Sequence, residues 1–189
     1  MTMQGRLYGF ATAAAFACLV LGAGQAQADG IFVCSDEFPG ESQVPGFVGC
    51  IEALSAGENI SRSVAGVGPD REGGAVSLGP YTLVMKLGPA SPAWRIAALS
   101  GKAAKDLITI SFTETVELAE REIFRADLTG VIVASVSLAA DSTNGGGTPV
   151  EVVTLDFIEI TWTLFLFGDD GSPLGMIDHT YNRATGVGR

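Results

Sequence analysis

The stretch that decides the fold is residues 150–167, VEVVTLDFIEITWTLFLF. In an extended chain its first half places Leu155 and Phe157 on one side. In its second half the large apolar residues, such as Ile160 and Trp162, occupy the alternate positions and would point to the opposite side. Such a change of phase within one β-prone run predicts a bulge or bend near Phe157, as in a strand that wraps a barrel or a sandwich.

The rest of the chain also reads as short strands, separated by clusters of Gly, Pro, Asn and Asp. Residues 81–87 read as a strand, and residues 107–112 alternate between apolar and polar positions. A long β-prone run over residues 124–138 is interrupted at Gly130. The sequence therefore predicts a mainly β fold.

One helix is expected, over residues 92–100. Ser91 can cap its start, Pro92 fits the first helical position, and Gly101 fits just past its end. Its apolar side should cover an open edge or end of the β structure. The residues expected on that side are Trp94, Ala97, Ala98 and Leu99.

Two segments look irregular. Residues 57–80 are small and polar, and are expected to form a long loop with a short extended piece. Residues 141–149 contain Asn144 and three consecutive glycines, which predicts a flexible turn.

The first 28 residues resemble a cleavable signal peptide. Arg6 is followed by an apolar run over residues 7–23, and small residues lead to an expected cleavage between Ala28 and Asp29. The alternatives are a transmembrane anchor, although glycines and a threonine interrupt the run, and a lipoprotein signal at Cys18, whose flanking residues fit less well. Residues 29–189 are then one domain.

The chain carries a formal net charge of −10, which becomes one unit more negative when Arg6 leaves. A strongly acidic protein repels nucleic acid and anionic lipid head groups. Neither nucleic acid nor a membrane is therefore expected as a partner of the processed chain.

Cys34 and Cys50 are the two cysteines that remain after removal of the signal peptide. Short apolar runs, residues 31–34 and 47–54, flank a segment rich in Pro and Gly, so antiparallel pairing centred near Ser42 would place the cysteines opposite each other. An oxidising compartment favours a disulfide, and two buried free thiols are the alternative.

No catalytic residue, cofactor site or metal site is expected. The single histidine, His179, follows Asp178, and neighbours on a strand point to opposite faces, so they would not form a catalytic pair. No cluster of cysteine and histidine suggests a metal site. Residues 169–171, Asp-Asp-Gly, read as a hairpin turn, with a weak calcium site as the alternative.

Four glutamates lie close together between residues 114 and 122. They are expected to line a solvated connection between strands. They are Glu114, Glu117, Glu120 and Glu122.

The order of short motifs resembles the Hcp family, the haemolysin-coregulated tube proteins of type VI secretion, over residues 30–186. The resemblance lies in the order and spacing of the motifs together. They are Gly30-Ile31-Phe32-Val33, Gly40-Glu41-Ser42, Gly49 to Ser55, Ala90-Ser91-Pro92, Gly145 to Thr163 and Tyr181-Asn182. Ordinary members lack a signal peptide, and Ala56-Gly57-Glu58-Asn59 replaces the family's basic and aromatic residues here.

The resemblance implies an Hcp-like β-barrel or two-sheet sandwich with one short helix at its side. It also implies a non-enzymatic structural or delivery protein that assembles into hexameric rings, with secretion apparatus components or effectors as further partners. With the signal peptide, the expected location is periplasmic or extracellular. The alternative function is a secreted monomer or single ring that serves as a binding protein or host-directed factor.

The signal peptide gives the first testable prediction. N-terminal sequencing of the exported protein should begin at Asp29, because signal peptidase cleaves after small residues such as those at 26–28. Retention of Met1 on exported material would contradict the cleavage.

Overall fold

The computed structural model describes residues 30–66, 71–117, 119–140 and 148–189. Two expected features, the signal cleavage between Ala28 and Asp29 and the glycines of 145–147, lie outside these ranges. The described chain is mostly β with one short helix, which confirms the expected fold class. The strands are β1 (Gly30–Cys34), β2 (Ile51–Gly57), β3 (Ile60–Ala65), β4 (Glu72–Leu78), β5 (Tyr81–Lys86), β6 (Ile108–Val116), β7 (Ala119–Thr129), β8 (Ile132–Ala139), β9 (Val150–Asp156), β10 (Glu159–Phe167), β11 (Pro173–Asn182) and β12 (Val187–Gly188).

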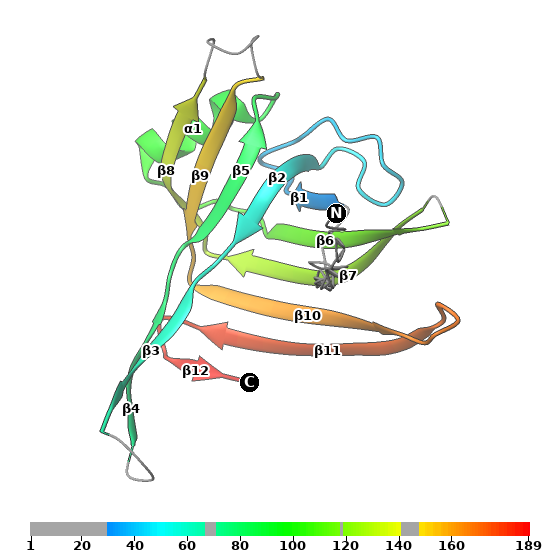
Figure 1. Cartoon of the computed structure of the whole chain (residues 1–189). Coiled ribbons are helices and arrows are strands. Elements are labelled where there is room, and N and C mark those ends of the chain that lie inside the picture. The colour runs from blue at the N-terminus through cyan, green and yellow to red at the C-terminus, as the bar shows by residue number, and fades with distance from the viewer. Residues whose placement is uncertain (1–29, 67–70, 118, 141–147) are drawn as a thin grey trace, which may run out of the picture.

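Ten strands form one continuous sheet in the order β12-β11-β10-β7-β6-β1-β2-β5-β9-β8. The sheet folds over between β1 and β2, so that β2, β5, β9 and β8 stand against the layer formed by the other six strands (Figure 1). Its edge strands β12 and β8 do not pair with each other, so the arrangement is two open layers and not a closed barrel.

The predicted bend near Phe157 is the corner at which the chain passes from one layer to the other. β9 pairs with β5 and β8, whereas β10 pairs with β7 and β11. Gly130, at φ +61°, makes the corresponding turn between β7 and β8. The change of alternation phase therefore marks a change of layer.

The core lies between the two layers, and both contribute apolar side chains to it. One layer supplies Val33, Ile110 and Leu128, all fully buried. The other layer supplies Leu83 and Leu155, which are also fully buried. Removing this apolar area from water is the main stabilising term for such a fold.

The helix α1 (Ser91–Ser100) covers one end of this core and contacts β8. Trp94 is fully buried, as expected, and Gly101 ends the helix at φ +61°. The placement of Leu99 on the same side was wrong, because this side chain is 84% exposed. Five residues correspond to a rotation of about 140° from Trp94, which turns Leu99 towards solvent.

Ser91 does not cap the helix as expected. The N-cap is Ala90, and no side chain caps it. The Ser91 hydroxyl instead donates to Glu151 Oε1 at 2.6 Å, while its oxygen accepts from the Gly88 N–H at 3.0 Å. Arg95 Nη1 donates to Glu151 Oε2 at 2.8 Å. The buried Glu151 carboxylate thus ties the helix to β9.

The expected loop over residues 57–80 is mostly a β-hairpin, so that interpretation was wrong in extent. β3 and β4 pair with each other in a separate two-stranded sheet. The hairpin continues the line of β2 and β5 away from the body of the molecule (Figure 1). Nearly every residue on it is exposed, so its sequence lacks the apolar alternation of a packed strand.

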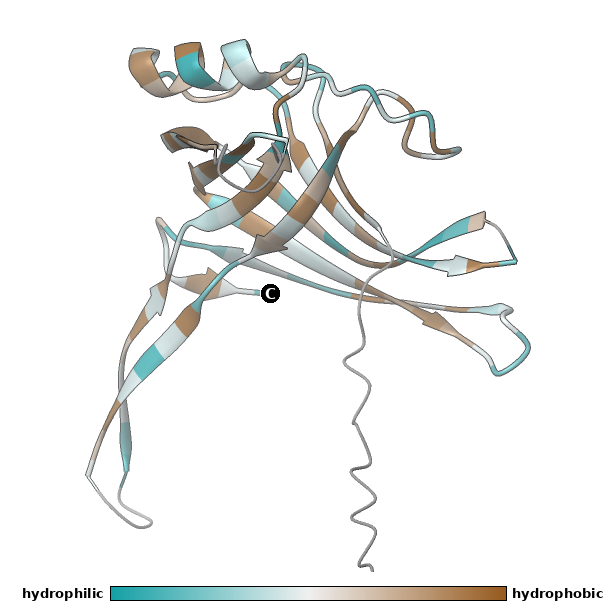
Figure 2. Cartoon of the chain, turned by 45° about the horizontal axis from the view of Figure 1, so that its top comes forward, coloured by the Kyte–Doolittle hydropathy of each residue, from teal (hydrophilic) through white to brown (hydrophobic). Residues whose placement is uncertain are grey.

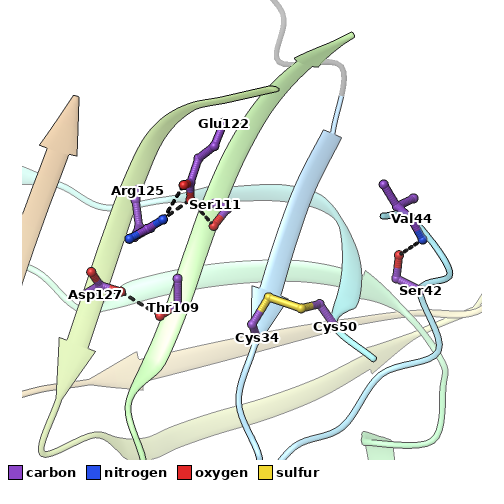
Figure 3. Close-up of a disulfide and its surroundings, with 9 residues drawn as sticks. All are labelled: Cys34, Ser42, Val44, Cys50, Thr109, Ser111, Glu122, Arg125 and Asp127. Carbon is purple, nitrogen blue, oxygen red and sulfur yellow. Dashed lines mark hydrogen bonds and ion pairs between the residues drawn. A yellow bond between two sulfur atoms is a disulfide. The ribbon is translucent and has the colours of Figure 1, made fainter. Parts of the chain in front are cut away.

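The expected disulfide is present in the structure. Cys34 ends β1 and Cys50 precedes β2, and the antiparallel register Val33↔Ile51 continues to place the cysteines opposite each other. Their sulfur atoms are 2.04 Å apart (Figure 3). The bond closes the loop over residues 35–49 at its base.

Backbone contacts close this loop on itself and at its base, and two ring contacts attach it to the body. The Gly40 N–H donates to Gly49 O at 2.7 Å, and a Cβ on Gly40 would lie 2.2 Å from Cys50 O. Phe38 stacks on Trp94 with 3.7 Å between ring centroids. Phe47 stacks on Phe32 at 4.3 Å. The loop is therefore a packed part of the structure.

Replacing both cysteines, Cys34→Ser with Cys50→Ser, should lower the free energy of unfolding by about 3 kcal/mol, because a bond that closes a loop of this size restricts the unfolded chain. Urea denaturation measures the change. Adding a reductant to the unmodified protein should reproduce it, and an unchanged midpoint in both cases would contradict a stabilising role.

Glu151→Ala should lower the free energy of unfolding by about 2–3 kcal/mol, because Arg95 and Ser91 lose a buried partner. The matched control is Glu114→Ala, which breaks the more exposed pair with Arg121 and should cost under about 1 kcal/mol. Equal losses in urea denaturation would show that burial of Glu151 adds nothing.

Candidate functional site

A polar hollow of about 520 Å³ lies on the outer face of the layer that contains β6 and β7. Cys34 and Phe47 form one side of it, and polar side chains of β6 and β7 form the other (Figure 3). Thr109 Oγ1 donates to Asp127 Oδ1 at 2.6 Å, and Ser111 Oγ donates to Glu122 Oε1 at 2.5 Å. The disulfide therefore borders a surface of the sheet that carries several polar side chains.

The acidic run at 114–122 is more structured than the solvated connection expected from sequence. Glu122 pairs with Arg125, and the hydrogen bond raises the pKa of the Arg125 guanidinium. Glu120 accepts from the fully buried Thr113 and from Thr115, and Arg121 pairs with Glu114. Glu117 lies at the exposed turn with φ +50°. The carboxylates of Glu114, Glu120 and Glu122 are thus held by neighbouring side chains within the hairpin.

The single histidine lies where the sequence placed it, on a strand. His179 is opposite Trp162 and Asp178 is opposite Thr163 in the β10–β11 pairing, so the two side chains point to opposite faces. Both are exposed. Among the described residues, no group of three or more His, Cys, Asp or Glu side chains could hold a metal ion.

Residues 169–171 form the expected turn between β10 and β11. The Gly168 N–H donates to Ser172 O at 2.8 Å, and Gly171 adopts φ +78°. The Asp170 carboxylate accepts from the Ser172 hydroxyl at 2.6 Å, which lowers the pKa of Asp170. This carboxylate therefore serves the turn itself.

A half-buried acid that no sequence pattern indicated lies at the base of the β3–β4 hairpin. Glu58 Oε1 accepts from the Trp162 indole N–H at 2.7 Å, whereas its buried Oε2 has no hydrogen-bond partner within the described ranges. Burial raises the pKa of the Glu58 carboxyl, and the bond from Trp162 partly offsets the rise. The two residues are far apart in sequence, so no local pattern could have paired them.

An apolar hollow of about 330 Å³ adjoins this acid, between the hairpin and the β10–β12 strands. Ile60, Val76 and Leu78 line it from the hairpin. Trp162 and Tyr181 line it from the sheet. Its lining is mostly aliphatic and aromatic, which suits contact with another apolar surface.

No helix in the described part of the chain is long and apolar enough to cross a membrane.

Solved structures of type VI secretion proteins share this fold, and three of them illustrate the similarity. A type six secretion system protein superposes with a TM-score of 0.74 at 17% identity, covering 85% of this chain and 99% of the other. Hcp1 from Salmonella typhimurium superposes with a TM-score of 0.66 at 21% identity, covering 85% of this chain and 98% of the other. A type VI secretion system effector from Yersinia pestis superposes with a TM-score of 0.63 at 19% identity, covering 80% of this chain and 98% of the other.

No curated protein matches the sequence. The family model described as "Type VI secretion system effector, Hcp" matches residues 28–164. The match spans well over half of the chain, and this protein therefore belongs to the Hcp family of type VI secretion.

Proposed function

We propose that this protein is a non-enzymatic structural or delivery component of type VI secretion that acts as a ring of six identical copies. Family membership supports the role. The single observation that carries self-association is the exposed β3–β4 hairpin, which extends beyond the body (Figure 2).

One face of β3 carries the two large apolar side chains of the strand, with Arg62 between them. Ile60 and Val64 lie on the same face of β3 and are 58% and 61% exposed. Ser61 and Ser63 lie on the opposite face. An isolated two-stranded hairpin is marginally stable in water, so an apolar face of this kind favours contact with a neighbouring copy.

The open edges of the large sheet provide a second reason for assembly. Among the described strands, β8 and β12 form the two edges of the sheet. Such edges carry unpaired backbone groups and favour pairing with another chain, which closed rotational symmetry can satisfy in every copy at once.

We also propose that the chain works outside the cytoplasm, in the periplasm or beyond the cell. The disulfide between Cys34 and Cys50 supports this location, because such bonds persist in oxidising compartments. The net charge of −10 supports a protein partner over nucleic acid or an anionic membrane.

Size-exclusion chromatography with light scattering tests the ring on protein purified after export. The expected mass is about six times that of one processed chain. Val64→Asp should weaken the ring, because burial of an unpaired carboxylate is costly. The protein concentration below which rings dissociate should rise by about tenfold or more.

Ser63→Asp is the matched control, since it adds the same charge to the opposite face of the same strand and should leave the mass unchanged. A strict monomer at high concentration would contradict the ring. That result would favour the alternative function, a secreted binding protein or host-directed factor of this fold.

A further inference from the structure

A gap opens in the layer formed by β2, β5, β9 and β8, at the point where β2 and β5 separate. Their pairing begins at Ala53↔Met85, so Ile51 and Glu52 lie beyond its end. Residues 40–42 take the place beside the start of β2, because the Ser42 N–H donates to Cys50 O at 3.0 Å and the Gly49 N–H donates to Ser42 O at 2.9 Å.

A pocket of about 220 Å³ lies in this gap, between residues 40–42, residues 86–88 and the start of α1. We call it the strand-gap pocket. Figure 1 shows the loop between β1 and β2 passing close to the end of β5 and to α1. The pocket is large enough for one peptide unit with part of a side chain, and too small for a large cofactor.

Buried polar groups line the strand-gap pocket. Glu151 is 1% exposed and is already bonded to Ser91 and Arg95. Trp94 is fully buried, and its indole N–H has no hydrogen-bond partner among the described residues. A buried donor without an acceptor is costly, so this N–H favours a ligand that brings a carbonyl or similar oxygen.

The charge of the lining selects among such ligands. Glu41 and Glu52 are exposed and face the pocket with one exposed cation, Lys86. Glu151, whose charge Arg95 neutralises, lines the same pocket as Trp94. An anion in the pocket would therefore face the carboxylates of Glu41 and Glu52, whereas a neutral amide would not be repelled.

We propose that the strand-gap pocket binds a short basic peptide segment. A backbone carbonyl of the peptide accepts from the Trp94 indole N–H, and an Arg or Lys side chain lies between the carboxylates of Glu41 and Glu52.

The test uses tryptophan fluorescence, because the chain has two tryptophans and Trp162→Phe leaves Trp94 alone. The probes are the blocked tripeptides Ac-Ala-Arg-Ala-NH2 and Ac-Ala-Glu-Ala-NH2. The arginine peptide should shift the emission of Trp94 saturably to longer wavelength. The glutamate peptide should bind at least about threefold more weakly.

Glu41→Gln and Glu52→Gln should each weaken binding of the arginine peptide about threefold, and added salt should act in the same direction. The matched control is Glu72→Gln on the distant β3–β4 hairpin, which should have no effect. Calorimetry on the unmodified protein gives the same comparison if Trp162→Phe fails to fold. No saturable binding, or equal binding of both peptides, overturns the proposal.

Discussion

A twisted sheet with apolar side chains along one face can bury them only against another apolar face, and here the sheet provides that face itself. Val33 and Ile110 from one layer pack in the same core as Leu83 and Leu155 from the other. Trp94 and its helix cover the end that the two layers leave open. The disulfide loop, the projecting hairpin and the strand-gap pocket all lie at the margins of this folded sheet.

Much of this arrangement could be predicted from local patterns. The phase change at Phe157 and the glycine at 130 marked the corners, because alternation and φ > 0 depend on a few adjacent residues. The hairpin at 57–80 was mistaken for a loop, since a strand with two exposed faces loses the apolar alternation that would reveal it. Leu99 was misplaced because apolar character alone does not determine the side of a helix.

At the candidate sites, contacts between residues close in sequence could be predicted, and contacts between distant residues could not. Cys34 and Cys50 are 16 residues apart on consecutive strands, so a hairpin was enough to bring them together. Glu58 and Trp162 are 104 residues apart, and Ser91 and Glu151 are 60 apart. Those contacts depend on the strand order, which the alternation of single strands does not specify.

The position of β1 has a consequence for how the molecule acquires its structure. The first strand of the described residues lies in the middle of the sheet, with β2 on one side and β6 on the other. The Thr113 hydroxyl reaches the Gly30 carbonyl across 83 residues of sequence. β1 therefore keeps one edge open until β6, which begins only at Ile108, is in place, and such high contact order makes folding slow and exposes intermediates to aggregation.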